Sequence, residues 1–316
     1  MRHTNQVIVA AAAALVLACS SPDEPEPSYA SQGAPRSGPA PTIEELAGAT
    51  FTGIEDAGPV ILRSGKWEGE PFEEGSASIP TVWLTEDFYL TGDVDADGVR
   101  EAVAHLTYST GGSGNFGFLA IMSRDDGKIV QRAVGALGDR VQIRDARVEG
   151  ARVALDVLQP GPQDGMCCPT ELATRTFAVR NGQLVETATD VTGSASLASL
   201  EGTEWVLRKL AWDEDAPSEP ELTLLIDSGR VSGSSGCNSY SGSVEPGETA
   251  TAFAIGTLVS TRKACPPEIM NLEQRYTAAL QSAGTWGFRF RRLVINYGEG
   301  EDFGSLVFEG REPSKK

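Results

Sequence analysis

Short runs of alternating apolar and polar residues, separated by turn residues, dominate this 316-residue chain from about residue 43 onward. An alternation with a period of two, as in 153–157, predicts strands with one buried face. The strongest hairpin signal is Asn181-Gly182, because this pair tolerates the positive φ of a tight turn. We therefore expect residues 43–190 to form a β-rich domain, an antiparallel sheet or sandwich with few helices.

The N-terminus has the three parts of a secretory signal. Arg2 and His3 are basic, residues 7–17 are apolar, and small Ala18 precedes Cys19. The segment resembles the lipobox of bacterial lipoproteins. That resemblance implies a signal peptide over residues 1–18 and a bilayer anchor made by acylation of Cys19, since several acyl chains give stable attachment. The alternatives are an ordinary cleaved signal or a core helix.

Residues 19–42 predict a disordered, extended tether, because they contain six prolines and almost nothing to bury. Ser20 follows the cysteine where enterobacterial sorting places Asp for inner-membrane retention. It therefore points to the periplasmic face of the outer membrane, with the inner membrane left open.

The net charge and the small number of histidines restrict the functions that this chain can have. The net charge is −18 with no basic block in the mature chain, which argues against a nucleic-acid partner. His105 is the one histidine left after signal cleavage, so a His-rich zinc site cannot form. We interpret it as an ordinary strand histidine, with a catalytic or sensing role as the alternative. Since GxSxG, HExxH and Walker lysine motifs are missing, we expect no enzyme. The alternative is an enzyme that uses a pair of buried carboxylates alone.

One acidic turn has the spacing of a cation loop. Carboxylates stand at relative positions 1, 3, 5 and 9 of the turn that begins at Asp93, with glycine at position 6. The candidate ligands of a structural calcium ion are Asp93, Asp95, Asp97, the Val99 carbonyl and Glu101.

This turn departs from an EF-hand, because position 12 is Ala104 and a strand pattern follows. It is similar instead to the calcium loops of FG-GAP and related β-repeat proteins, and it looks like a loop of bacterial lipoprotein domains that precede a META domain. The alternative is a plain Asp/Gly turn.

Four cysteines remain once Cys19 is set aside, and three pairings are open. We favour Cys237 with Cys265. That choice leaves Cys167 and Cys168 as neighbours, which could form only a strained vicinal disulfide. Free thiols or pairing across domains are the alternatives.

The C-terminal part carries the clearest family resemblance. The blocks Gly-Cys-Asn-x-Tyr-x-Gly at 236–242 and Thr-Arg-x-Ala-Cys at 261–265 resemble the META domain of HslJ-like bacterial proteins. The resemblance covers about 197–310 and implies an α+β fold, a curved antiparallel sheet with one helix, in envelope and heat-shock-associated proteins. It implies no agreed activity.

The residues favour the same fold independently. Apolar positions after Pro266-Pro267 recur at helical spacing, and Gly284 is expected as a left-handed cap. Asn238 is expected to bond backbone at a tight bend. The overall fold class is therefore α+β, mostly antiparallel β.

We expect a non-catalytic, membrane-anchored envelope lipoprotein involved in envelope integrity or stress tolerance. The alternative is a pilotin-like binding module that shelters a lipid or a peptide of an envelope partner. Its apolar groove would be lined by Trp205, Trp286, Phe288 and Phe290.

Overall fold

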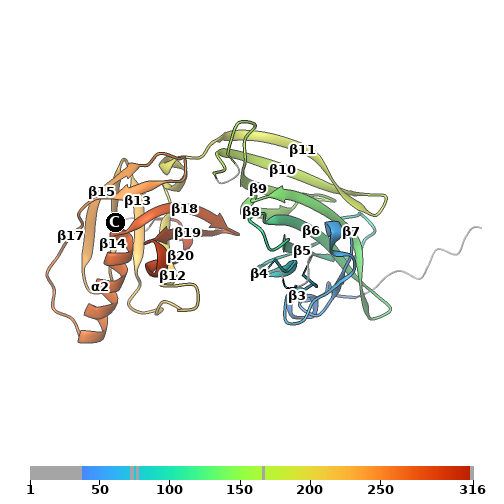
Figure 1. Cartoon of the computed structure of the whole chain (residues 1–316), viewed down its shortest axis with the longest axis horizontal. Coiled ribbons are helices and arrows are strands. Elements are labelled where there is room, and N and C mark those ends of the chain that lie inside the picture. Colours follow the sequence, from blue (N-terminus) through green and yellow to red (C-terminus); the bar gives the residue numbers. More distant parts are fainter. Residues whose placement is uncertain (1–37, 72–74, 76–77, 166–167, 314–316) are drawn as a thin grey trace, which may run out of the picture. The chain divides into compact units, whose positions relative to one another are not determined.

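Among the described residues of the computed structural model, every strand pairing is antiparallel, and two α-helices accompany the sheets (Figure 1). The structure describes residues 38–71, 75, 78–165 and 168–313. The predicted fold class is thus confirmed. In the described part of the chain, no helix has the length and apolar character needed to cross a membrane.

The first large sheet is a five-stranded meander in the order β3-β4-β5-β6-β7. Its hairpins follow the turn signals, since Asp126 and Gly127 have φ of 46° and 78° at the β6–β7 turn. The strands are β3 (Lys66–Glu68), β4 (Thr81–Gly92), β5 (Glu101–Ser109), β6 (Phe116–Asp125) and β7 (Lys128–Asp139). The elements before them are α1 (Ile43–Leu46), β1 (Thr50–Phe51), the 3-10 turn Glu55–Ala57 and β2 (Val60–Ile61).

A four-stranded sheet follows in the order β11-β10-β9-β8. Its strands are β8 (Gln142–Val148), β9 (Val153–Gln159), β10 (Glu171–Arg180) and β11 (Gln183–Ser194). The predicted Asn181-Gly182 hairpin is confirmed, with φ of 51° and 76° and Arg180 paired with Gln183. One core joins the two sheets through residues such as Leu119 and Leu155. A second core, which includes Phe51 and Leu106, fills the other face of the five-stranded sheet.

The third sheet belongs to the C-terminal part and has nine strands. Its main path is β16-β15-β14-β13-β12-β20-β19-β18, and β17 pairs with β15. The strands are β12 (Glu204–Lys209), β13 (Thr223–Asp227), β14 (Arg230–Ser234), β15 (Ser239–Pro246), β16 (Phe253–Ile255), β17 (Val259–Ser260), β18 (Ala283–Arg289), β19 (Arg292–Tyr297) and β20 (Gly304–Arg311). The 3-10 turns Leu197–Leu200 and Gly300–Asp302 flank it.

Helix α2 (Pro267–Gln281) packs on this sheet through Tyr276, Ala279 and Leu280. It begins at Pro267, as the sequence predicts, because proline suits the first helical position. The expected left-handed cap at Gly284 is wrong, since Gly284 lies inside β18. Instead, the N–H of Ser282 and its Oγ donate to carbonyls of the last helical turn, so no left-handed residue is needed there.

The bend before β15 is fixed to the entrance of α2 by a disulfide and a side-chain amide. Cys237 and Cys265 form the predicted disulfide, with Cα atoms 5.9 Å apart. Oδ1 of Asn238 accepts the N–H of Lys263 at 2.8 Å, and its Nδ2 donates to Glu273 at 2.9 Å. Asn238 thus holds backbone, as expected, and also reaches a helix carboxylate.

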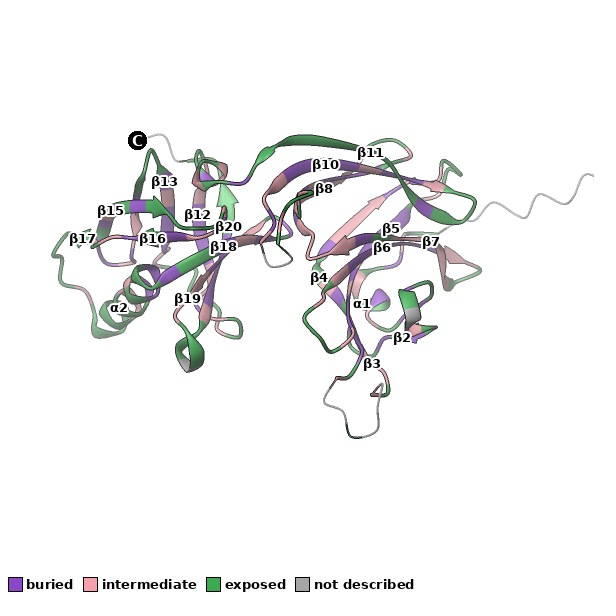
Figure 2. Cartoon of the chain, turned by 45° about the horizontal axis from the view of Figure 1, so that its top comes forward, coloured by how far each residue is buried: buried purple, intermediate pink, exposed green. Residues whose placement is uncertain are grey.

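The cores are shared along the chain, which agrees with residues 36–316 forming one compact unit. Phe290, at the β18–β19 turn, belongs to the core between the first two sheets, 4.7 Å from Phe88 between ring centres. Conversely, Leu158 and Leu172 of the second sheet belong to the core of the third sheet. Figure 2 shows buried residues on strands of all three sheets and exposed ones along β11.

Candidate metal centre

The acidic turn predicted from the sequence connects β4 to β5, whose end residues Gly92 and Glu101 are paired. Its shape depends on two positive φ values, 63° at Ala96 and 86° at Gly98. Val94 anchors the turn, because its side chain is 1% exposed and belongs to the core between the two sheets. The loop is therefore held against the sandwich by apolar burial at its start.

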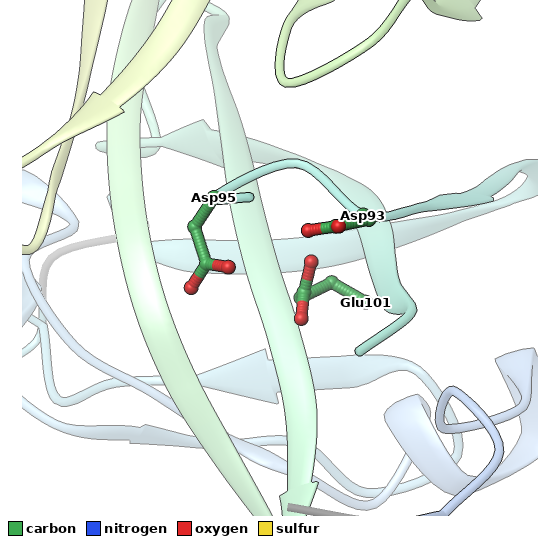
Figure 3. A group of neighbouring side chains, drawn as sticks. All are labelled: Asp93, Asp95 and Glu101. Atoms are coloured by element: carbon green, nitrogen blue, oxygen red, sulfur yellow. The ribbon is translucent and has the colours of Figure 1, made fainter. Parts of the chain in front are cut away.

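Three carboxylates of the loop converge. Oxygen atoms of Asp93, Asp95 and Glu101 all lie within 4.8 Å of one another. Figure 3 shows Asp93 and Asp95 reaching from the loop toward the side chain of Glu101. Glu101 is only 1% exposed, and its Oε2 accepts the Val94 N–H at 2.9 Å. A buried carboxylate thus forms the inner wall of the group.

The electrostatics of the group favour a cation. Burial raises the pKa of Glu101 to about 7, and the charges of Asp95, Asp97 and Asp93 add to the rise against the Val94 hydrogen bond. Burial also raises the pKa of Asp95, with Asp97 as the next cause. No ion pair between described residues involves Asp93, Asp95 or Glu101. Like charges held this close are stabilised by a cation between them.

The nearest basic residue in sequence does not neutralise the group. The guanidinium of Arg100 donates instead to Oγ1 of Thr91 at 2.6 Å. Hard carboxylate oxygens on a glycine-bent loop suit Ca²⁺, which takes six to eight oxygen ligands. The donor set therefore fits calcium, with carbonyls or water needed to complete the shell.

One predicted ligand, Asp97, is placed differently from Asp93, Asp95 and Glu101. Oδ1 of Asp97 accepts the N–H of Val99 at 2.9 Å, and the Asp97 carboxylate is outside the converging group. This hydrogen bond turns the carboxylate back toward its own loop. The ligand roles of Asp97 and of the Val99 carbonyl remain predictions. The spacing of the loop predicted Glu101 as a ligand, but its burial could not be read from the sequence.

The signal peptide with Cys19, most of the tether, and Cys167 lie outside the described residues. Cys168 is disulfide-bonded.

The four aromatic residues proposed for an apolar groove are all buried. Trp205, Trp286 and Phe288 belong to the core of the third sheet, while Phe290 belongs to the core between the first two sheets. They do not form an exposed apolar patch, because each completes a β core.

Comparison with known proteins identifies the C-terminal part. Residues 198–308 match the model of the META domain, which confirms that part of the sequence prediction. No curated protein matches the chain. A solved structure described as the NMR structure of the protein from Burkholderia xenovorans is 27% identical, with a TM-score of 0.30. The match covers 36% of this chain and 86% of that one.

Proposed function

We propose that the protein is a non-catalytic lipoprotein of the cell envelope, anchored through Cys19, that supports envelope integrity or stress tolerance. The META domain at 198–308 carries this proposal, because that domain is associated with envelope proteins. The apolar run that ends at Cys19 supports the anchor.

The tether supports the same proposal. From Cys19 to the first helix at Ile43, the chain is rich in proline and small residues. Such a segment spaces a folded part away from a bilayer without adding a core of its own. We place the folded part at the periplasmic face of the outer membrane, on the strength of Ser20.

Metabolic labelling with a fatty acid, followed by membrane fractionation, tests the anchor. The wild-type chain should carry the label and sediment with outer-membrane markers, whereas Cys19→Ser should lose the label and leave the membrane fraction. Ser20→Ala is the matched control, and it should keep both properties. An unlabelled wild-type chain, or a labelled Cys19→Ser variant, would overturn the proposed anchor.

A deletion strain tests the role. Loss of the gene should increase sensitivity to detergent and heat, and the wild-type gene should restore tolerance. Restoration by Cys19→Ser to the wild-type level would show that anchoring is not needed. Unchanged tolerance of the deletion strain would contradict a role in envelope integrity.

We also infer that the Asp93 loop binds a structural calcium ion. The carrying observation is the approach of Asp93 and Asp95 to the buried carboxylate of Glu101. The ion would lower the repulsion among these groups and brace the β4–β5 hairpin. Extracellular calcium modules bind at high micromolar to millimolar concentration, which suits a permanent brace rather than a signal.

A further inference from the structure

One end of the five-stranded sheet has an inner face that the second sheet leaves uncovered. On this face, Val103 and Leu119 belong to the core between the sheets. Four residues farther along β5 and two farther along β6, Thr107 lies opposite Gly117, and Trp83 of β4 lies opposite Thr107. These residues replace the aliphatic side chains of the covered end, so the same face changes from core to surface.

A cavity of about 1130 Å³ opens over this end of the face. Its lining includes Trp83, Thr107 and Gly117 from the sheet, the segment 140–143 before and at the start of β8, and Trp212 with 288–290 from the C-terminal part. Ligand pockets are commonly a few hundred to a thousand Å³. The space is therefore large enough for a ligand of several rings.

The cavity combines exposed aromatic faces with polar groups. Trp83 is 38% exposed and Trp212 is 50% exposed, although both are large apolar side chains. Hydrogen-bonding side chains, those of Thr107 and Asn115 among them, line the same space. A fatty chain needs a continuous apolar sleeve, which these groups interrupt.

The cavity has little net charge. Lys66 is paired with Glu68 at 2.6 Å, and Arg140 is paired with Asp139. The other charged lining residues are Arg289, whose guanidinium stacks on the Trp212 ring at 5.4 Å, and Glu86. One cation and one anion are thus left, so neither a polyanion nor a basic peptide is matched by the lining.

His105 lies on the lining between the covered and uncovered ends of the face. Its Nδ1 is 2.8 Å from Oγ1 of Thr85, while its buried Nε2 has no hydrogen-bond partner among the described residues. Gly117 leaves room for the ring, because a Cβ there would lie 3.2 Å from Nε2. A buried nitrogen without a partner is destabilising, and a polar ligand that gains access to it would remove that penalty.

We propose that this cavity binds an uncharged oligosaccharide, with sugar rings stacked on Trp83 and Trp212. A sugar ring presents apolar C–H faces and hydroxyl edges, and the cavity offers aromatic faces beside hydrogen-bonding groups. The proposal stands on the cavity alone and does not depend on the lipid anchor.

Titration of tryptophan fluorescence tests the proposal on the full chain, purified in a detergent without a sugar headgroup. Triacetylchitotriose, cellotriose and maltotriose are each added to about 10 mM, tenfold above a millimolar Kd. At least one trisaccharide should give a saturating change. No change with all three would overturn the proposal.

Trp83→Ala and Trp212→Ala should each weaken the binding at least tenfold, and circular dichroism checks that each variant is folded. Phe303→Ala is the matched control, because Phe303 is 57% exposed and lies outside the cavity lining. An equal loss in the control, or no loss in either folded tryptophan variant, would contradict the assigned site. Affinity should be unchanged between low and high salt, and a steep salt dependence would contradict an uncharged ligand.

Discussion

The two halves of the molecule bury different kinds of polar groups. In residues 43–194, the buried polar residues include the charged side chains of Glu101 and Arg175. In residues 197–311, the buried polar residues described are neutral, such as Asn238 and Ser235. The second half also has the Cys237–Cys265 disulfide.

This difference predicts different sensitivities. Buried charges make stability depend on pH and on ions, because their environment determines their protonation. Neutral hydrogen bonds and a disulfide are insensitive to both, but the disulfide depends on redox conditions. The first half should therefore respond to pH and ions. Reductant should weaken the second half through the Cys237–Cys265 bridge, and the disulfide of Cys168 gives the first half a redox-sensitive group as well.

Removal of the disulfide should have the largest effect. The Cys237→Ala/Cys265→Ala variant should lose about 3 kcal/mol of unfolding free energy, because the bridge spans 28 residues. Urea unfolding measures the loss, and hydrogen exchange should place it in residues 197–311. Reductant should destabilise that half of the wild type but not of the variant. A loss of stability confined to residues 43–194 would contradict the predicted difference between the two halves.

Acid should act on the first half through His105. Burial lowers the pKa of His105 to about 4, with Arg289 as the second cause. Between pH 6.5 and 4, His105 binds a proton in the unfolded chain but not in the folded protein. The contribution of His105 to stability is therefore complete above pH 6.5 and is lost toward pH 4, by about 3 kcal/mol. Urea unfolding at several pH values should show that His105→Gln lacks this part of the fall. Parallel pH profiles of the wild type and His105→Gln would contradict this role of His105.

Asn238→Ala should destabilise the second half by about 2 kcal/mol. The substitution leaves the Lys263 N–H and the Glu273 carboxylate without the amide partner, and partly buried groups that lose a hydrogen bond lower the stability. Asn271→Ala on the exposed face of α2 is the matched control, with an expected change below about 0.5 kcal/mol. Thermal unfolding of both variants makes the measurement. Equal changes would show that the amide network contributes little.

Calcium should have the smallest effect. At about 10 mM calcium and a millimolar Kd, the ion should stabilise the first half by about 1 kcal/mol. Glu101→Gln should abolish the gain, while Glu149→Gln, in the β8–β9 turn, should retain it. Thermal unfolding with calcium or chelator measures the shift. A gain that survives in Glu101→Gln would place the ion elsewhere.

Local chemistry explains what could be predicted from the sequence. Asn181-Gly182 determines a hairpin by its own backbone preferences, and Pro267 starts a helix for a similar reason. The spacing of Asp93 and Asp95 also brings carboxylates together within one short turn. These features need no distant part of the chain.

What could not be predicted depends on partners far along the chain. Whether Glu101 is buried is decided by the packing of Val94 and the sheet around it. That Trp286 and Phe288 are core residues could not be predicted, because their assignment to a core depends on the strand order. The cavity beside Trp83 is formed by segments more than a hundred residues apart.

The insertion of Phe290 into the core beside Phe88 has a consequence for synthesis. The N-terminal sandwich receives one of its packing residues from a turn near the end of the chain. A nascent chain that stops before that turn leaves Phe88 without the Phe290 ring, and only the His105 ring remains beside it. The N-terminal sandwich therefore completes its packing only after almost all of the polypeptide has been made, although it is synthesised first.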